Sequence, residues 1–318
     1  MIRIGWVGFH FEGIEAIKAV IEAGYKIYII VTLDDEELKK RSGAGDYESI
    51  ARAYQIPLLK VKNINSEAVA NVLRELSLDI VFVIGWSQII KPEILKIPKL
   101  GMIGAHASLL PHDKGSAPIN WSLIRGAKKT GNTLIWLEEE VDSGLIIDQR
   151  EIEITPYDTC ATLYKKVAET NKEMILNCLS KLSNREKLGT PQPKINEPIL
   201  PRRRPTDGLI NWDQRSYEVY NFVRALTRPY PGAFSYLDGK KYIIWKSFVL
   251  MGLEYESRFQ PGEIIGPVYS SEEEACGQLV ACGSGYLGIL EIEDINGNVY
   301  NGQKLSNFNW GGKVFKNE

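Results

Sequence analysis

The sequence predicts two folded parts: an α/β domain with a mainly parallel sheet, followed by a smaller β-barrel-like domain. Three observations lead to this prediction. Apolar, strand-sized runs alternate with helical patterns in the first half of the 318-residue chain, a proline-rich segment begins at Gly189, and short β-rich runs separated by glycine-containing turns fill the remainder. Apolar runs without polar alternation are typical of strands that helices cover on both faces, as in parallel sheets.

The first half of the chain supplies the elements of the α/β domain. Its β-rich runs predict strands at residues 2–7, 26–32, 57–61, 79–84, 102–105, 132–137 and 145–152. Apolar residues at helical spacing predict helices at residues 13–23, 47–54, 66–76, 117–124 and 159–182. Gly24 closes the first of these helices, because glycine is the usual residue just past a helix C-terminus.

The composition shifts at Gly189, where five prolines fall within residues 189–205. Proline lacks a backbone N–H and disfavours helix in the residue before it, which predicts a semi-rigid linker. Beyond it we expect a helix at residues 217–226 and strands at 233–237, 241–248, 263–265, 278–281 and 287–292. Asp238-Gly239 is a hairpin signal. The predicted boundaries are therefore a first domain at 1–188, a linker at 189–205 and a second domain at 206–318.

The composition excludes several classes of function. The formal net charge is -2 and no block of like charge resembles a nucleic-acid tail, which argues against a nucleic-acid partner. The longest apolar runs are strand-sized, so no membrane span is expected. The N-terminus enters a strand pattern directly and shows no signal peptide, and the four cysteines form no CxxC pair, which favours a cytoplasmic protein with reduced thiols. With only three histidines, no metal is expected.

Two polar residues follow strand-like runs and form a candidate catalytic pair. His106 stands where an apolar run ends, and Asp142 lies in a Val-Asp-Ser-Gly turn after the next run. In an α/β sheet such strand ends face the ligand crevice. A histidine exchanges protons near neutral pH and a carboxylate can orient it, which suits a reaction in which an attacking amine loses a proton. The alternative is that both residues are hydrogen-bonded loop structure.

The turn after the first strand carries a third candidate. Gly5, Gly8 and Gly13 do not spell the GxGxxG dinucleotide pattern, and no Walker A sequence is present, so a tight strand-to-helix turn is favoured. His10 lies in this turn and is either a contact to a ligand or an ordinary loop histidine.

The stretch from Gly101 to Gln149 resembles the folate-dependent formyltransferases, whose signature runs Asn-x-His-x-SLLP-x-x-x-G-x-x-P, then TG-x-T, then D-x-G-x-I. The matching residues are His106, Ser108, Leu109, Leu110, Pro111, Gly115, Pro118, Thr130, Gly131, Thr133, Asp142, Gly144 and Ile146. Residues 231–236 (PGAFSY) and 244–245 (IW) are similar to the C-terminal domain of methionyl-tRNA formyltransferases. They are more similar to the formyltransferase domain of UDP-4-aminoarabinose pathway enzymes.

The resemblance implies a Rossmann-like domain followed by an OB-like domain, with 10-formyltetrahydrofolate as formyl donor, an amine as acceptor and no metal. It implies that His106 and Asp142 are catalytic. It also implies that the pterin lies over the loop after the strand at 79–84 and near the turn at 141–144. The residues implied to bind the folate are Trp86, Ser87, Gln88, Ile89, Val141 and Gly144.

One position departs from the family pattern. The family's catalytic asparagine stands two residues before the histidine, and that position is Gly104 here. The asparagine amide donates a hydrogen bond to the formyl oxygen, and losing one such donor costs about 3 kcal/mol, or about a hundredfold in rate. The replacement donor can be a backbone N–H at 104–106, a protonated His106, a bound water, Ser87 or Gln88. The alternative is a catalytically impaired homologue that binds folate or nucleotide.

The resemblance leaves two classes of acceptor amine. Methionyl-tRNA formyltransferases carry a basic loop after the second strand, whereas here four acids at residues 34–37 precede Lys39, Lys40 and Arg41. An acidic stretch beside a phosphate backbone is unfavourable, so a nucleotide-linked amino sugar (UDP- or dTDP-linked) is the preferred acceptor and methionyl-tRNA the alternative. A sugar-nucleotide acceptor implies a role in polysaccharide biosynthesis, and the oligomeric state stays open.

Several residues are then expected to contact this acceptor. Residues 116–121 (SAPINW) resemble an Arg-Ala-Pro-Leu-Asn-Trp stretch of the aminoarabinose enzymes, with Ser116 in place of the arginine. Arginines of the segment 202–207 are expected to bind the diphosphate, because guanidinium groups pair with phosphate oxygens in bidentate fashion. A solvated surface run is the alternative for these arginines. The predicted substrate contacts are His10, Ser108, Gly115, Ser116, Asn120, Arg203 and Arg204.

Overall fold

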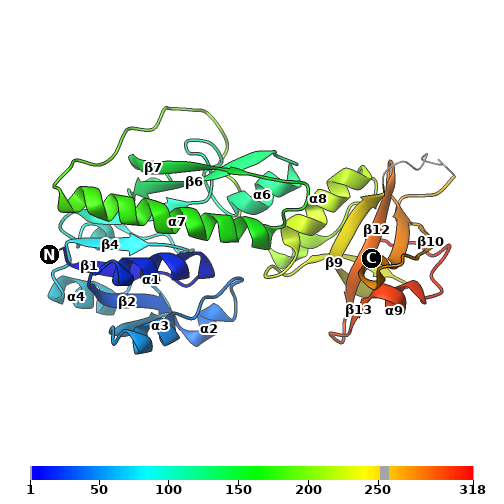
Figure 1. The fold of residues 1–318 in the computed structure, drawn as a ribbon, viewed down its shortest axis with the longest axis horizontal. Coiled ribbons are helices and arrows are strands. Elements are labelled where there is room, and N and C mark those ends of the chain that lie inside the picture. The colour runs from blue at the N-terminus through cyan, green and yellow to red at the C-terminus, as the bar shows by residue number, and fades with distance from the viewer. Residues whose placement is uncertain (1, 251–257, 318) are drawn as a thin grey trace. The chain divides into compact units, whose positions relative to one another are not determined.

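The computed structural model describes residues 2–250 and 258–317 of the chain. The chain divides into two compact units (Figure 1). The first unit comprises Met1–Pro118, Lys129–Ile154 and Thr162–Arg202, and the second comprises Ile119–Lys128, Thr155–Ala161 and Arg203–Glu318. The proline-rich segment up to residue 202 therefore groups with the first unit. Among the described residues, no helix is both long and apolar enough to span a membrane.

A seven-stranded sheet forms the centre of the first unit, with strand order β3-β2-β1-β4-β5-β6-β7. Its strands are β1 (Ile4–Val7), β2 (Ile27–Leu33), β3 (Leu58–Val61), β4 (Ile80–Val83), β5 (Gly101–His106), β6 (Lys129–Trp136) and β7 (Ile146–Glu153). The first five run parallel to one another, and β6 and β7 each pair antiparallel with their neighbour. The prediction of a mainly parallel sheet is confirmed. Parallel strands need crossover connections, which the intervening helices provide.

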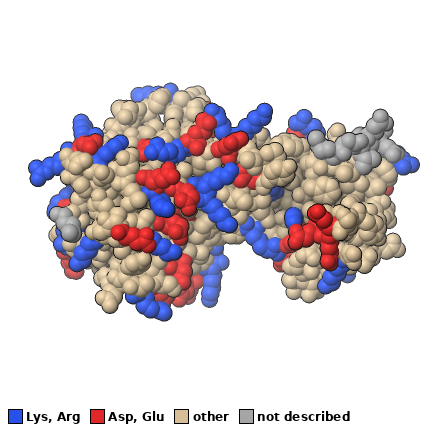
Figure 2. Space-filling view, in the orientation of Figure 1, with Lys and Arg blue, Asp and Glu red and all other residues tan. Residues whose placement is uncertain are grey.

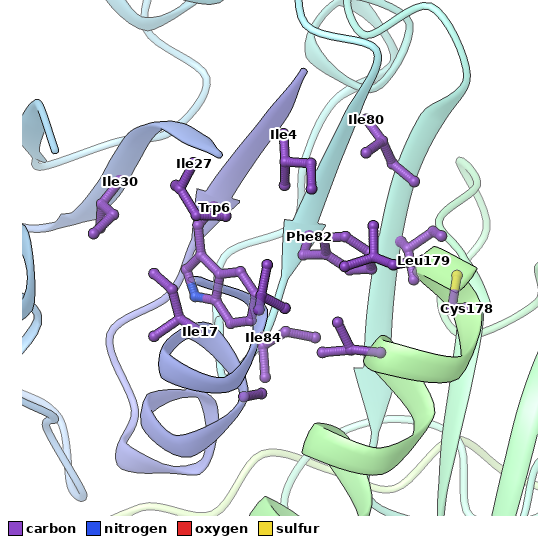
Figure 3. Close-up of a cluster of buried hydrophobic side chains, with 14 of the residues drawn as sticks. Ile4, Trp6, Ile17, Ile27, Ile30, Ile80, Phe82, Ile84, Cys178 and Leu179 are labelled. Carbon is purple, nitrogen blue, oxygen red and sulfur yellow. The ribbon is translucent and has the colours of Figure 1, made fainter. Parts of the chain in front are cut away.

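Helices cover both faces of this sheet, as the continuous apolar runs require. Alternate strand residues face opposite sides, so Trp6 and Phe82 enter one core and Val7 and Val83 the other. The first core packs against α1 (Ile14–Glu22), α3 (Tyr47–Ala53) and α7 (Cys160–Ser183), and Figure 3 shows Trp6 and Phe82 meeting the side chains of α1 and α7. The second core packs against α4 (Glu67–Glu75) and α5 (Pro92–Leu95).

The second unit is built on an antiparallel sheet with path β10-β11-β12-β9-β8, to which β13 adds at β12. Its strands are β8 (Ala233–Leu237), β9 (Lys240–Leu250), β10 (Ile264–Val268), β11 (Gly277–Ala281), β12 (Tyr286–Asp294) and β13 (Val299–Asn301). β8 and β9 form the predicted hairpin, and Asp238 and Gly239 have φ angles of 50° and 71°. Two positive φ angles are the geometry that Asp-Gly turns adopt between twisted strands.

Three further helices belong wholly or mainly to the second unit. α6 (Pro118–Ile124) and α8 (Ser216–Leu226) fall within a residue of the predicted ranges, whereas α9 (Gly302–Ser306) and strand β13 carry no pattern that predicted them.

On the face of the first unit visible in Figure 2, basic and acidic side chains are interspersed, in keeping with the net charge of -2. Lys60 illustrates this mixing, because its ammonium group lies 2.9 Å from Asp35 and 2.8 Å from Glu48.

Candidate active site

His106 is the last residue of β5 and is only 8% exposed. Its Nδ1 lies 3.4 Å from Oδ2 of Asp142, and its Nε2 lies 2.8 Å from the backbone oxygen of Asp113. Both ring nitrogens therefore face oxygen atoms that can only accept hydrogen bonds. A neutral imidazole has a single N–H and can donate it to one of these two oxygens. The sequence predicted the pair His106 and Asp142, and the structure brings them together.

Asp142 occupies a tight turn between β6 and β7. Its φ of +52° lies in the left-handed region, which Asp tolerates better than most residues. Besides facing His106, Oδ2 of Asp142 accepts a hydrogen bond of 2.8 Å from the backbone N–H of Gly115. Two residues on, Gly144 passes so close to Trp136 that an added Cβ would lie 1.7 Å from the Trp136 backbone oxygen. The path of this turn thus requires the glycine of the Asp-x-Gly pattern and is compatible with its aspartate.

Side chains from the two antiparallel strands fix the loop that follows His106. The Thr133 hydroxyl donates to the Ser108 backbone oxygen at 2.6 Å. The amide of Gln149 donates to the Leu110 oxygen and to the Thr133 hydroxyl, both at 2.9 Å. The predicted site residue Ser108 donates its own hydroxyl to the His112 oxygen at 2.8 Å. Ser108 therefore holds the shape of the loop, and no sequence pattern predicted that Gln149 would contribute to it.

Gly104 lies two residues before His106 on the same strand, so both positions share one face of the sheet. A Cβ built on Gly104 would lie 2.6 Å from Cδ2 of Leu137. The space that an asparagine side chain would need next to His106 is therefore occupied by an apolar group. Leu137 carries no pattern that singled it out in the sequence.

Gln88, in the loop after β4, makes hydrogen bonds with both ends of its side-chain amide. Its Nε2 donates to the Lys62 oxygen at 2.8 Å, and its Oε1 accepts from the Ile64 N–H at 2.9 Å. These bonds fasten the loop to the segment between β3 and α4. They orient the Gln88 amide toward that segment and use one of its two N–H donors.

The other residues predicted to bind folate lie at the two turns named by the resemblance. Ser87 is exposed and Ile89 is 70% exposed. Trp86 packs edge-on against Phe9 at 6.0 Å between ring centres, and its buried indole N–H has no hydrogen-bond partner among the described residues. Val141, at the other turn, is 36% exposed.

The turn after β1 brings His10 to the same loop. The backbone N–H of His10 donates to the Gly85 oxygen at 3.2 Å, which joins the carboxyl ends of β1 and β4. The ring is 6% exposed, with Nδ1 3.7 Å from the Glu12 carboxylate. It packs on Phe11 at 4.4 Å and on Tyr164 at 4.8 Å between ring centres. His10 thus belongs to an aromatic cluster, and no described contact links its ring to His106.

The remaining residues predicted to contact the acceptor are Ser116, Asn120, Arg203 and Arg204. The Ser116 N–H donates to the Leu200 oxygen at 3.0 Å. Asn120, in the second unit, is fully buried and its amide donates to the Ala225 oxygen at 2.6 Å, which ties α6 to α8. The structure therefore gives the Asn120 amide a structural partner within its own unit.

Arg203 and Arg204 also belong to the second unit. The Arg203 guanidinium lies over the rings of Trp121 and Phe222, 4.9 Å and 5.5 Å from their centres. Partial burial lowers the pKa of this guanidinium from its ordinary value. Arg204 is exposed, and its backbone N–H donates to the Asp207 carboxylate at 2.6 Å.

Among the described residues, no group of three or more His, Cys, Asp or Glu side chains is placed to hold a metal ion. The Asp142 carboxylate faces Nδ1 of His106 at 3.4 Å and the Asp113 backbone oxygen faces Nε2 at 2.8 Å, so a positive charge that develops on the ring meets both oxygens.

Comparison with known proteins identifies the family. A formyl transferase family model matches residues 27–179, and a model of the formyl transferase C-terminal domain matches residues 203–309. The bifunctional polymyxin resistance protein ArnA of Wigglesworthia glossinidia brevipalpis is 33% identical over 309 residues, which are 94% of this chain and 44% of that protein.

Solved structures share the fold at lower identity. HypX from Aquifex aeolicus in complex with tetrahydrofolic acid superposes with a TM-score of 0.66 at 18% identity, over 92% of this chain and 44% of that one. The N-formyltransferase from Helicobacter canadensis, in complex with folinic acid and dTDP-3-aminofucose, gives a TM-score of 0.65 at 19% identity, over 91% and 99% of the two chains. The chain thus spans less than half the length of ArnA and HypX. Its two matched regions and its pair of domains show that it belongs to the formyl transferase family.

Proposed function

We propose that this chain transfers a formyl group from 10-formyltetrahydrofolate to the amine of a nucleotide-linked amino sugar. The observation that carries the proposal is the pair of His106 and Asp142, 3.4 Å apart at the carboxyl end of β5 in a formyl transferase domain. The likeness to ArnA supports this class of acceptor. The ligands in the Helicobacter canadensis complex, folinic acid and dTDP-3-aminofucose, support both the donor and the acceptor class.

The pair can manage the proton that such a transfer must move. A neutral amine attacks the formyl carbon, a C–N bond forms and the bond from that carbon to the folate nitrogen breaks. The amine loses one proton and the departing nitrogen gains one, so the charge balances. His106 can carry this proton between them, and Asp142 stabilises the ring while it is charged. Gly115 holds the carboxylate in place through its N–H.

Ion pairs near α2 (Asp35–Leu38) weigh against tRNA as the acceptor. Lys40 and Arg41 both point to Glu37, with distances of 2.7 Å and 3.6 Å, and Lys60 is paired with Asp35 at 2.9 Å. Cations that are neutralised by neighbouring acids are poor partners for a phosphate backbone. Arg203 and Arg204 are the better candidates for a phosphate contact, on the scale of a single diphosphate.

A second candidate is a homologue that binds folate and nucleotide without efficient transfer. It is favoured by one observation, the apolar Leu137 side chain in the space beside Gly104. The two candidates differ in turnover and agree in folate binding, so a single assay separates them.

The test incubates the protein with 10-formyltetrahydrofolate and a panel of UDP- and dTDP-linked amino sugars, with methionyl-tRNA as the contrasting acceptor. Mass spectrometry should show one added formyl group on a sugar nucleotide and none on the tRNA. His106→Asn should abolish this product with folding unchanged, and near-normal turnover in that variant would remove His106 from the mechanism. Formylation of tRNA alone would contradict the choice of acceptor. Folate binding without any product would favour the impaired homologue.

A further inference from the structure

The proline-rich segment of residues 189–202, here named the strap, runs across both loops that carry the catalytic pair. At its start, Thr190 and Ile146 exchange two backbone hydrogen bonds of 2.8 Å. Near its end, the Leu200 N–H donates to the Lys114 oxygen at 2.7 Å, and the Leu200 oxygen accepts from Ser116 at 3.0 Å. The strap is therefore fastened at one end beside the Asp142 turn and at the other beside the loop after His106.

Gln192 is the strap side chain that holds the turn itself. Its amide nitrogen donates 2.8 Å hydrogen bonds to the backbone oxygens of both Asp142 and Gly144. Both amide hydrogens are thereby used on the two residues that bracket the turn. Its Oε1 is buried and has no hydrogen-bond partner among the described residues. A buried acceptor without a partner costs free energy, so the two donated bonds must outweigh that cost.

The other side of the pair depends on the far end of the strap. Gly115 has a φ of +111°, and a Cβ on it would lie 2.5 Å from the Leu200 oxygen. This close approach fixes the Gly115 N–H that donates to Oδ2 of Asp142. The neighbouring Asp113 oxygen is the one that faces Nε2 of His106.

We propose that Gln192 is a positioning residue of the site, which sets the Asp142 carboxylate against His106 by holding the backbone of the turn. This inference rests on the proposed formyl transfer. His106 ends β5 and leads into one loop, Asp142 lies in another, and the strap is hydrogen-bonded to both loops. Prolines in the strap reduce the entropy lost when it is ordered, so an exposed segment with few contacts can still hold its path. A misplacement of about 1 Å in such a pair can cost about a hundredfold in rate.

The experiment compares Gln192→Ala and Gln192→Met with Lys194→Ala, a substitution at an exposed strap position. The methionine variant keeps the volume and removes both donors. We expect kcat to fall at least about tenfold in both Gln192 variants, with little change in the KM for folate and none in Lys194→Ala. Equal kcat in all three proteins would overturn the proposal. A rise in KM at constant kcat would overturn it as well, because that would place Gln192 in binding.

A double-mutant cycle with Asp142→Asn decides whether Gln192 acts through that carboxylate. We expect Gln192→Met to cost little further rate once Asp142 is changed, because the effect it transmits is already lost. Full additivity of the two losses would contradict the inference.

A readout without turnover keeps the inference separate from the proposed function. In ¹⁵N-histidine-labelled protein, the ring signals of His106 should shift in Gln192→Met and stay unchanged in Lys194→Ala. If the wild-type protein formylates no amine and this shift is still seen, the proposed function fails and the positioning role stands. Unchanged His106 signals in Gln192→Met would overturn the positioning role, whatever the activity.

Discussion

Placing an asparagine at position 104 tests how the site stabilises the oxyanion of the proposed transfer. Gly104 shares a strand face with His106, so the amide of Gly104→Asn would project beside the His106 ring. One added donor to the oxyanion lowers the barrier by about 3 kcal/mol, or about a hundredfold. The new Cβ would, however, lie 2.6 Å from Cδ2 of Leu137. Overpacking of this kind costs about 1–3 kcal/mol of folding stability.

The new Cβ at position 104 would clash with the end of the Leu137 side chain, so shortening that side chain should relieve the clash. Leu137 is partly buried, and Leu137→Ala should cost about 2 kcal/mol while opening the space beside Gly104. We therefore expect Gly104→Asn alone to be destabilised with a small gain in rate. The double variant Gly104→Asn/Leu137→Ala should exceed Leu137→Ala in rate by about a hundredfold, and its stability loss should be less than the sum of the single losses.

The assay is single-turnover formyl transfer followed by mass spectrometry, with urea unfolding of each variant. Gly104→Ala/Leu137→Ala serves as the matched control, because it adds the Cβ without the amide. If the asparagine and alanine double variants are folded and transfer formyl at the same rate, the reasoning is refuted. The oxyanion would then be stabilised by groups already present, such as the His106 ring.

Three further predictions concern stability and thiol chemistry. In urea titrations, Gly144→Ala should lower the free energy of unfolding by about 3 kcal/mol or more, because the Cβ would lie 1.7 Å from the Trp136 oxygen. Gly311→Ala is the control: its Cβ would meet nothing closer than 3.7 Å, so the free energy of unfolding should change by less than about 0.5 kcal/mol. The Lys99 ammonium bound to Asp79 lowers the pKa of that carboxyl, so the contribution of Asp79 to stability is present near neutral pH and is lost as pH falls through the folded-state pKa. Urea titrations between about pH 6 and about pH 2 should therefore show a shallower loss of stability for Asp79→Asn than for the wild-type protein. The same loss of stability in both proteins would contradict this. Burial raises the pKa of three thiols to about 12, so they should react with a thiol reagent only after denaturation, and rapid labelling of the native protein would show that they are accessible. These thiols are Cys160, Cys178 and Cys282.

The buried strands were predictable because their sequence pattern reflects the packing they make. The run at Ile80–Val83 is apolar at every position, and in the structure its side chains enter both cores. The antiparallel direction of β6 and β7 was not predictable, since pairing direction depends on which neighbour a strand meets and leaves no local pattern. β13 has three residues and α9 five, which is too short to show a period.

Some residues of the candidate site were likewise predictable from the sequence and others were not. The proximity of His106 and Asp142 was predictable because a histidine and an acid each follow a strand-like run, where an α/β sheet places its ligand crevice, and the family motif names the same two positions. The roles of Gln192 and Leu137 were not predictable, because they depend on contacts across the fold. Gln192 lies in a segment whose prolines predict only a semi-rigid linker, and it bonds to backbone oxygens, which carry no sequence signal. Leu137 matters only through the absence of a side chain at Gly104.

β3 and β7 are the outer strands of the seven-stranded sheet in the described part of the chain, and their residues disfavour the addition of further strands to the sheet. An outer strand exposes unpaired N–H and C=O groups that a strand from another molecule could use. β3 has only four residues and carries Lys60, and β7 carries Asp148, Arg150 and Glu151. A foreign strand would have to strip water from these charges before it could pair. At the start of β7, Ile146 is already paired with Thr190 of the strap, so part of that edge is covered as well. Addition of a foreign strand should therefore be costly at both edges of the sheet.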